Sequence, residues 1–293
     1  MARNEIKGDD LLYRFFNEVL PSEPELFEKI PRLLVISMAV WFPKSVYRSM
    51  PVLLPWVLRD TTCRGKKSKG EWVVPDQWGA PNRDGYLRDD NSLVKGIPKS
   101  LGITSESHSF VNGRHLGTEF VAAHIWRENN TDSLASRLPE LNTFVPNLVW
   151  LPSQVAKLSD REGSHVQAAL KEISWGIYHD IPLTGNAKIV ADHSWSLLPK
   201  PAELKSVLEH ELNWFVETTK FMKTRQSKLS AVVDALEKLK DGQKVSEKLQ
   251  PSRFRDGLAS VPLETREKLL SDLRLHIPQG ESSEEISIQI DRL

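Results

Sequence analysis

The sequence predicts an α+β protein that is mostly helical and contains a small core of two strands and one helix. Apolar residues repeat at helical spacing over much of residues 9–58 and again from residue 200 onward. Between these parts, an apolar segment ends at His124 and a second one, Asn147–Pro152, leads into a short polar helix. We therefore expect three regions: an N-terminal helical region with a basic and polar loop (1–100), the strand–strand–helix core (101–180) and a C-terminal helical region (181–293).

The composition is ordinary for a soluble globular protein, with 40% hydrophobic and 27% charged residues. Lys and Arg (39) balance Asp and Glu (39), so a surface for nucleic acid has to be a local patch. The single cysteine, Cys63, excludes an internal disulfide framework and a cysteine-paired zinc ribbon. The chain begins without a signal-peptide pattern, and its most apolar run, Leu33–Phe42, is too short to span a bilayer. We expect a cytoplasmic protein.

Three helices are expected in the N-terminal region. The first covers Leu11–Leu20 and stops at Pro21, the second begins at Pro24, and the third covers Leu33–Trp41. The aromatic residues of this region are interpreted as core, with base stacking as the alternative: Tyr13, Phe15, Phe16, Trp41, Phe42 and Trp56.

Residues 59–100 differ in character from the helices that precede them. Residues 61–100 hold eight Lys or Arg against five Asp or Glu, and a short strand is expected at Trp72–Pro75. Trp72, Trp78 and Tyr86 argue against disorder. The segment is either a DNA-contacting loop or a solvated loop packed by its aromatic residues. In the first case the basic residues Arg64, Lys66, Lys67 and Lys69 would contact phosphates.

Amphipathic helices are expected over 164–180, Leu204–Val216, Leu229–Leu239 and Leu263–Leu275, and a short strand near Ile189–Val190. The tail from Gln279 is acidic and serine-rich, and it is expected either to be mobile or to form a final strand at Ile286–Ile290. The helices after residue 200 carry a basic face, which is either simply solvated or a surface for a partner: Lys220, Lys223, Arg225, Lys228, Lys238, Lys240, Lys244 and Lys248.

One stretch of the predicted core carries a recognisable order of residues. Ala-Ala-His-Ile, with His124, ends the first strand; about twenty residues later Asn147-Leu-Val-Trp-Leu-Pro forms the second strand, and a polar helix follows. This order resembles the ββα-metal, or HNH, nuclease motif. The resemblance covers about 50 residues. It implies that His124 is a general base whose ring is oriented by a backbone carbonyl, and that Asn147 fixes the loop between the strands.

The same resemblance implies an Mg²⁺ or Mn²⁺ ion, since the available ligands are oxygen atoms. Ala123 and Ala156 stand where the family often has ligands, which leaves Asp160 and Gln154 as candidates. Glu119 is a further candidate, although strand alternation predicts that it faces away from His124. Arg127, Lys157 and Arg161 are expected to neutralise the scissile phosphate.

Other histidines compete with His124 for the role of general base. His179-Asp180 and Asp192-His193 are adjacent pairs, and adjacent residues on regular structure are expected to point apart. His115 is a minor candidate on a preceding strand.

The expected function is metal-dependent cleavage or nicking of DNA, by analogy in bacterial restriction or anti-phage defence. The first alternative is a non-catalytic DNA-binding or scaffold subunit of a defence complex, built on a degenerate HNH core. The second is a helical scaffold whose basic faces bind a protein partner.

Overall fold

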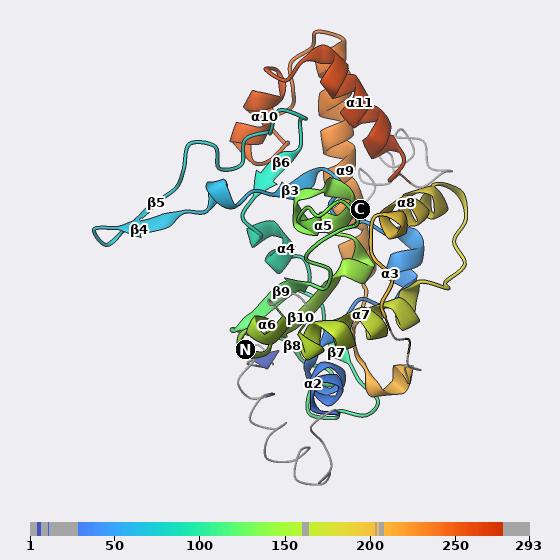
Figure 1. The fold of residues 1–293 in the computed structure, drawn as a ribbon. Helices are drawn as coiled ribbons and strands as arrows, with labels where there is room; N and C mark the ends of the chain where they lie inside the picture. Colours follow the sequence, from blue (N-terminus) through green and yellow to red (C-terminus); the bar gives the residue numbers. More distant parts are fainter. Residues whose placement is uncertain are drawn as a thin grey trace.

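The computed structural model describes residues 5, 6, 11, 29–159, 164–202, 204 and 208–277. The chain is a mixture of about 45% helix and 16% strand (Figure 1), which confirms the predicted α+β class. The first two predicted helices, apart from Leu11, and the tail after Ile277 lie outside the described residues. None of the described helices is both long enough and apolar enough to span a bilayer.

The described α-helices are α2 (Ile30–Met38), α3 (Lys44–Ser49), α4 (Ser92–Gly96), α5 (Pro139–Asn142), α6 (Ser153–Ser159), α7 (His165–Tyr178), α8 (Gly185–Ser196), α9 (Thr219–Lys240), α10 (Ser252–Leu258) and α11 (Leu263–Arg274). The 3-10 helices are η3 (Thr61–Cys63), η4 (Ala135–Arg137), η5 (Val145–Asn147) and η6 (Glu209–Glu211). The strands are β1 (Glu5–Ile6), β2 (Val40–Trp41), β3 (Val57–Arg59), β4 (Lys66–Ser68), β5 (Glu71–Val73), β6 (Leu87–Asp89), β7 (Ile103–Thr104), β8 (His115–Leu116), β9 (Phe120–His124), β10 (Leu148–Pro152) and β11 (Asn213–Phe215).

A five-stranded sheet in the order β7-β11-β2-β10-β9 organises the fold. β10 is antiparallel to β9 and to β2, whereas β2 and β11 are parallel neighbours. The sheet therefore takes β2 from the predicted N-terminal region, β7, β9 and β10 from the predicted core, and β11 from the predicted C-terminal region. Three smaller pairs complete the described strands: β1 with β8, β3 with β6, and β4 with β5.

Aromatic side chains fill the space where the central strands meet. The rings of Phe42, Trp150 and Phe215 contact one another with centroids 5.1–5.3 Å apart. Trp41 and Phe42 are fully buried and Trp56 is 5% exposed, so the interpretation of these three as core is confirmed. Tyr13, Phe15 and Phe16 lie outside the described residues.

The prediction of a helix over Leu33–Trp41 is wrong at its C-terminal end. α2 stops at Met38, and Ala39 is extended with φ −75° and ψ 139°. Val40 then pairs with Trp150 on one side and with Asn213 on the other. The Asn213 side-chain amide donates to the carbonyl oxygens of Ala39 and Ser37, so a neighbour distant in sequence terminates the helix.

Two further elements differ from expectation. The predicted helix over Leu204–Val216 is wrong in its described part, because Asn213–Phe215 is strand β11, held between β2 and β7. The predicted strand near Ile189–Val190 is also wrong, since both residues lie in α8. In contrast, the predicted helices at 164–180, 229–239 and 263–275 are confirmed as α7, α9 and α11.

The basic segment after β3 forms a hairpin, β4–β5, that projects from the body of the protein (Figure 1). β5 confirms the strand expected around Trp72. Lys69 and Gly70 form the turn with φ of +50° and +86°, the two positive values that a tight two-residue hairpin turn requires. Glycine adopts such an angle without strain, which accounts for Gly70 at this position.

Candidate functional site

The strand–loop–strand–helix order predicted around His124 is present. β9 pairs with β10 so that Leu148 lies opposite His124 and Pro152 lies opposite Phe120. α6 begins directly after β10 and packs against both strands. α7 covers the adjoining loop, where the Gln167 side chain donates to the carbonyl oxygen of Ile125 at 3.2 Å.

Asn147 closes the loop between the two strands. Its side-chain oxygen accepts from the backbone N–H of Trp126 at 2.7 Å, and its side-chain nitrogen donates to the carbonyl oxygen of Leu141 at 3.0 Å. Its backbone carbonyl accepts from the N–H of Ile125 at 3.0 Å. Asn147 is fully buried. The loop-fixing position that the resemblance gave to Asn147 matches these contacts.

His124 is half-buried at the C-terminal end of β9. Its Nε2 lies 2.8 Å from the carbonyl oxygen of Asn142, and because a carbonyl only accepts, Nε2 carries the proton. The other ring nitrogen, Nδ1, carries no proton in this tautomer, and the side chain of Asn142 also interacts with the ring. This tautomer leaves Nδ1 as a proton acceptor.

Burial is the main reason why the pKa of His124 is lowered to about 4. The positive charge of Arg59, at the end of β3, lowers the pKa further, whereas the hydrogen bond to Asn142 raises it. The imidazole is therefore neutral at pH 7. A neutral ring is the form that a general base needs, although its basicity is low until an anion approaches.

Arg59 is a residue that sequence reasoning missed. Its Nε is buried without a hydrogen-bond partner among the described residues, and its guanidinium acts electrostatically on His124. Nothing in the sequence points to it, because tertiary packing relates β3 to β9: α5 packs against β3, and the α5 residue Asn142 contacts His124. A cation beside a candidate base is suited to neutralise a phosphate.

The candidate metal ligands are not gathered at His124 in the described structure. Glu119 precedes β9, is exposed and has a φ of +68°, so it lies outside the strand on which alternation was predicted. Its carbonyl accepts from the N–H of Ser153, next to Gln154, at the end of the β9–β10 pair away from His124. At roughly 3.3 Å per residue, about 13 Å of strand separates that end from His124.

Asp160 and Arg161 lie outside the described residues, so the principal candidate ligand is not placed. Ala156 is buried, and no cluster of three His, Cys, Asp or Glu side chains occurs in the described ranges. Mg²⁺ prefers about six oxygen ligands, and neither Glu119 nor Gln154 lies at the His124 end of the strands. These residues alone do not fit the predicted ion.

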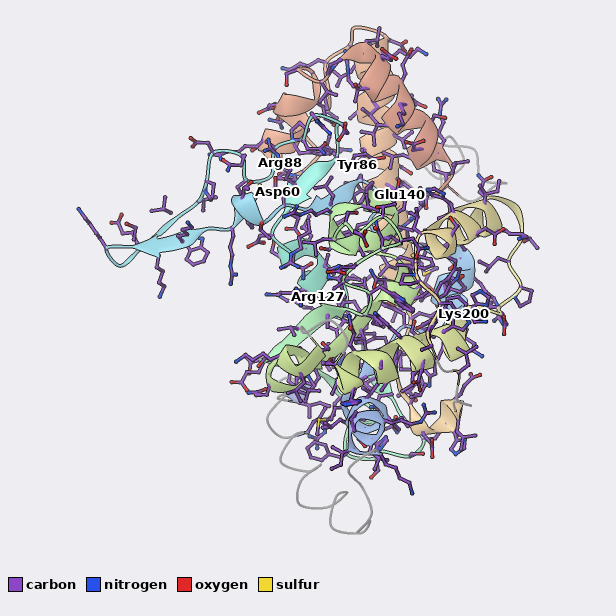
Figure 2. All side chains as sticks on the ribbon, in the orientation of Figure 1. Asp60, Tyr86, Arg88, Arg127, Glu140 and Lys200 are labelled. Carbon is purple, nitrogen blue, oxygen red and sulfur yellow. The ribbon has the colours of Figure 1, made fainter. Side chains whose placement is uncertain are left out.

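The predicted phosphate-binding residues fall into two groups. Arg127, three residues after His124, is half-buried, and Lys157 is exposed on α6. The second group lies on or beside the hairpin and is wholly exposed: Arg64, Lys66, Lys67 and Lys69. Figure 2 shows Arg127 together with Asp60 and Arg88, which mark the base of this hairpin.

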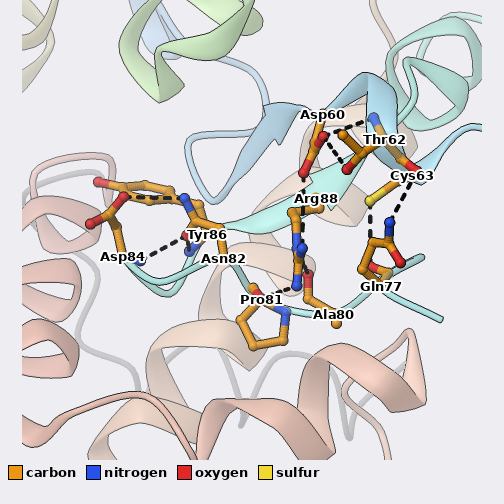
Figure 3. A network of polar contacts seen from close by, with 10 residues as sticks. All are labelled: Asp60, Thr62, Cys63, Gln77, Ala80, Pro81, Asn82, Asp84, Tyr86 and Arg88. Carbon is orange, nitrogen blue, oxygen red and sulfur yellow. Dashed lines mark hydrogen bonds and ion pairs between the residues drawn. The ribbon is translucent and has the colours of Figure 1, made fainter. Parts of the chain in front are cut away.

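Polar contacts fix the base of the hairpin (Figure 3). The Cys63 thiol donates to the carbonyl oxygen of Gln77 at 3.4 Å, and the Gln77 side chain donates to the carbonyl oxygen of Thr62 at 3.2 Å, which joins the entering and leaving chains. Arg88 donates to the carbonyl oxygen of Pro81 and lies 4.0 Å from Asp60. These contacts therefore fix the residues from which strands β4 and β5 project.

The competing histidines have local partners. The prediction that His179 and Asp180 point apart is wrong, because His179 Nδ1 lies 2.8 Å from an Asp180 oxygen just beyond the end of α7, where helical alternation no longer applies. Asp192 pairs with Lys188. His115 lies on β8, as expected, and its Nδ1 contacts the carbonyl oxygen of Leu101 at 2.9 Å.

Comparisons of this chain with models of protein families, with curated proteins and with solved structures find no match.

Replacing Asn147 with Ala should lower the free energy of unfolding by about 2–5 kcal/mol, because it leaves a buried N–H and a buried carbonyl without partners. Urea denaturation measures this loss. The matched control is Asn130→Ala, which removes one exposed hydrogen bond to Ser196 and should cost at most about 1 kcal/mol. Equal losses in the two variants would contradict the closure role of Asn147.

Stability should fall as the pH is lowered from about 6.5 to about 4. Over this range the unfolded chain binds a proton at residue 124 that the folded chain, with a pKa of about 4, does not bind. The difference in pKa corresponds to roughly 3 kcal/mol. His124→Gln should flatten the profile of unfolding free energy against pH by an amount of this order, whereas the exposed-site control His193→Gln should leave it unchanged. A His124→Gln profile as steep as wild type would contradict the buried neutral state.

Proposed function

We propose that this chain is a metal-dependent DNA endonuclease that cleaves or nicks phosphodiester bonds, with His124 as the general base. The observation that supports it most is the state of the His124 ring. A backbone carbonyl holds Nε2–H, and Nδ1 is left to accept a proton within a strand–loop–strand–helix unit that Asn147 closes. The resemblance of this stretch to HNH nucleases gives the same role to the same residue.

In the proposed reaction a water molecule attacks the phosphorus atom while Nδ1 of His124 takes its proton. The new P–O bond forms as the bond to the 3′ oxygen breaks, and that oxygen is protonated from solvent, which leaves a 5′-phosphate and a 3′-hydroxyl. Arg59, close to the ring, and Arg127, just past β9, oppose the negative charge that grows on the phosphate. The incoming anion also raises the basicity of His124.

A divalent ion, Mg²⁺ or Mn²⁺, would supply additional charge neutralisation when bound. In the proposal its protein ligands are Asp160 and Gln154, with water completing the shell. Gln154 is the second residue of α6 and lies at the end of the strands away from His124. The requirement for metal is therefore tested separately from the role of the histidine.

The hairpin β4–β5 is the proposed DNA contact outside the reacting centre. A two-stranded ribbon has the width that the major groove admits, and its three lysines, with Arg64 just before β4, suit the phosphate backbone. Trp72, 60% exposed, lies opposite Lys67 on this ribbon and offers a ring to the groove. Restriction or anti-phage defence in a bacterium is proposed by analogy with HNH proteins that carry flanking helices of their own.

The alternative proposal is a non-catalytic DNA-binding or scaffold subunit of a defence complex. Ala123 and Ala156 at the usual ligand positions favour it, as does the lowered pKa of His124. In that case the strands and helix around Asn147 serve as a structural core only.

Wild-type protein with Mg²⁺ or Mn²⁺ should nick supercoiled plasmid, and His124→Ala should lower the rate by about 10²-fold or more, the usual contribution of a general base. His193→Ala is the matched control and should retain the wild-type rate. A chelator should abolish the nicking. Gel separation of supercoiled and relaxed plasmid measures each rate. Equal nicking by wild type and His124→Ala, or none by either protein, would favour the non-catalytic alternative.

Lys66→Glu/Lys67→Glu should weaken binding of duplex DNA and make the slope of log K against log salt concentration shallower by about 2, one unit for each lost phosphate contact. Fluorescence anisotropy over a range of salt concentrations measures the slope. Lys244→Glu/Lys268→Glu makes the same charge change at exposed sites away from the hairpin and should leave the slope as in wild type. If both pairs shift it equally, only net charge matters and the hairpin is not the contact.

A further inference from the structure

A cavity of about 780 Å³ lies beside the candidate site, between α9, the residues just before β3, β6 with α4, and the residues before α10. Its volume is in the range of sites for small molecules, about 300–1,000 Å³. Arg59, which acts on His124, is opposite Asp89 in the β3–β6 pair, and Asp89 lines the cavity. The cavity therefore adjoins the His124 region without including it.

The wall of the cavity is largely apolar and carries aromatic rings. Trp56 is 5% exposed, while Trp78 and Phe221 are half-buried. Leu93 of α4, 39% exposed, adds an apolar side chain that the fold leaves open. Flat rings at a cavity wall suit a ligand with a planar ring of its own, since stacking of a base on an aromatic side chain is worth about 1–3 kcal/mol.

The rim of the cavity is positively charged. Lys220, Thr224 and Lys228 follow one another at four-residue spacing, so they form one stripe of α9, and Lys248 lies in the segment before α10. All three lysines are exposed, and none has a carboxylate partner within the described residues. Asp89 is the only acidic side chain among the described lining residues, and Ser92 and the N–H of Leu93 already donate to its oxygens.

Arg225 adds a buried charge below this rim. The sequence places it on a solvated basic face, but that expectation is wrong, because Arg225 is 6% exposed. Its guanidinium donates to the carbonyl oxygens of Val52, Leu53 and His276 and to the side chain of Gln226, and no carboxylate of the described chain pairs with it. Burial lowers its pKa to about 10, so it is still charged at pH 7. The carbonyl oxygens accept hydrogen bonds from the Arg225 guanidinium but do not neutralise its positive charge.

We propose that this cavity binds a nucleotide, with the base against Trp56, Trp78 and Phe221 and the phosphate at Lys220, Lys228 and Lys248. The shared chemistry is a planar base joined to an anionic phosphate. Its source is either a free nucleotide or a nucleotide that belongs to a single strand. The proposal does not depend on phosphodiester cleavage by His124.

Isothermal titration calorimetry with the full chain tests this site. The probes are nucleoside mono- and triphosphates, the matching nucleosides, inorganic phosphate, dodecyl phosphate and a short single-stranded oligonucleotide. A nucleotide or the oligonucleotide should bind at least about tenfold more tightly than a nucleoside or inorganic phosphate. Only a base joined to a phosphate contacts both the aromatic wall and the lysines of the rim. Binding of mononucleotides identifies the free source, and binding of the oligonucleotide alone identifies the strand.

Lys220→Glu/Lys228→Glu should weaken this binding by about tenfold or more, and Trp78→Ala should weaken it through loss of stacking. Lys223→Glu/Lys244→Glu changes two exposed lysines that do not line the cavity, and it should bind like wild type. His124→Ala should also bind like wild type, which separates this test from that of the nuclease. Absence of binding by every nucleotide probe, equal binding by Lys220→Glu/Lys228→Glu and wild type, or tightest binding by dodecyl phosphate would overturn the proposal.

Discussion

The two side-chain hydrogen bonds of Asn147 are the constraint on which the candidate site depends. They join the N–H of Trp126, just past β9, to the carbonyl of Leu141, so the excursion between β9 and β10 is closed at both of its ends. This closure brings Asn142 to His124, where its carbonyl selects the tautomer of the ring. The Asn142 side chain in turn donates to the carbonyl oxygen of Val57 in β3, the strand that carries Arg59. Two buried amides, those of Asn147 and Asn142, therefore tie the loop to the elements around the histidine.

The features that sequence reasoning recovered are those with a local signal. Helices α7, α9 and α11 have long amphipathic patterns, and β9 and β10 are five-residue apolar runs that end at recognisable residues. Strands β2 and β11 were predicted as helix because segments of two or three residues have no period of their own. Their extended state comes from pairing with each other across 173 positions of sequence. Arg59 was missed for the same reason, because only tertiary packing brings it to His124.

Positive charge is distributed in three places around a chain whose net charge is zero. Arg59 and Arg127 are near His124, three lysines lie on the β4–β5 hairpin with Arg64 just before it, and three lysines with Arg225 surround the cavity. In a neutral protein such local patches, and not an overall field, provide the attraction for an anion. The β3–β6 pair lies between these three groups of charges. β3, which carries Arg59, precedes the hairpin, and β6, whose residue Asp89 lines the cavity, follows it.

The parallel pairing of β2 with β11 has a consequence for biosynthesis. During translation the β9–β10–α6 unit leaves the ribosome well before Asn213–Phe215. Until these residues are synthesised, β2 lacks one of its two neighbouring strands, and the aromatic cluster lacks Phe215. Domains acquire their stability only when such non-local contacts can form. The sheet that supports His124 is thus completed late, when most of the polypeptide exists. A chain terminated before residue 213 would lack β11, the strand that joins β2 to β7 within the sheet, and not merely a peripheral helix.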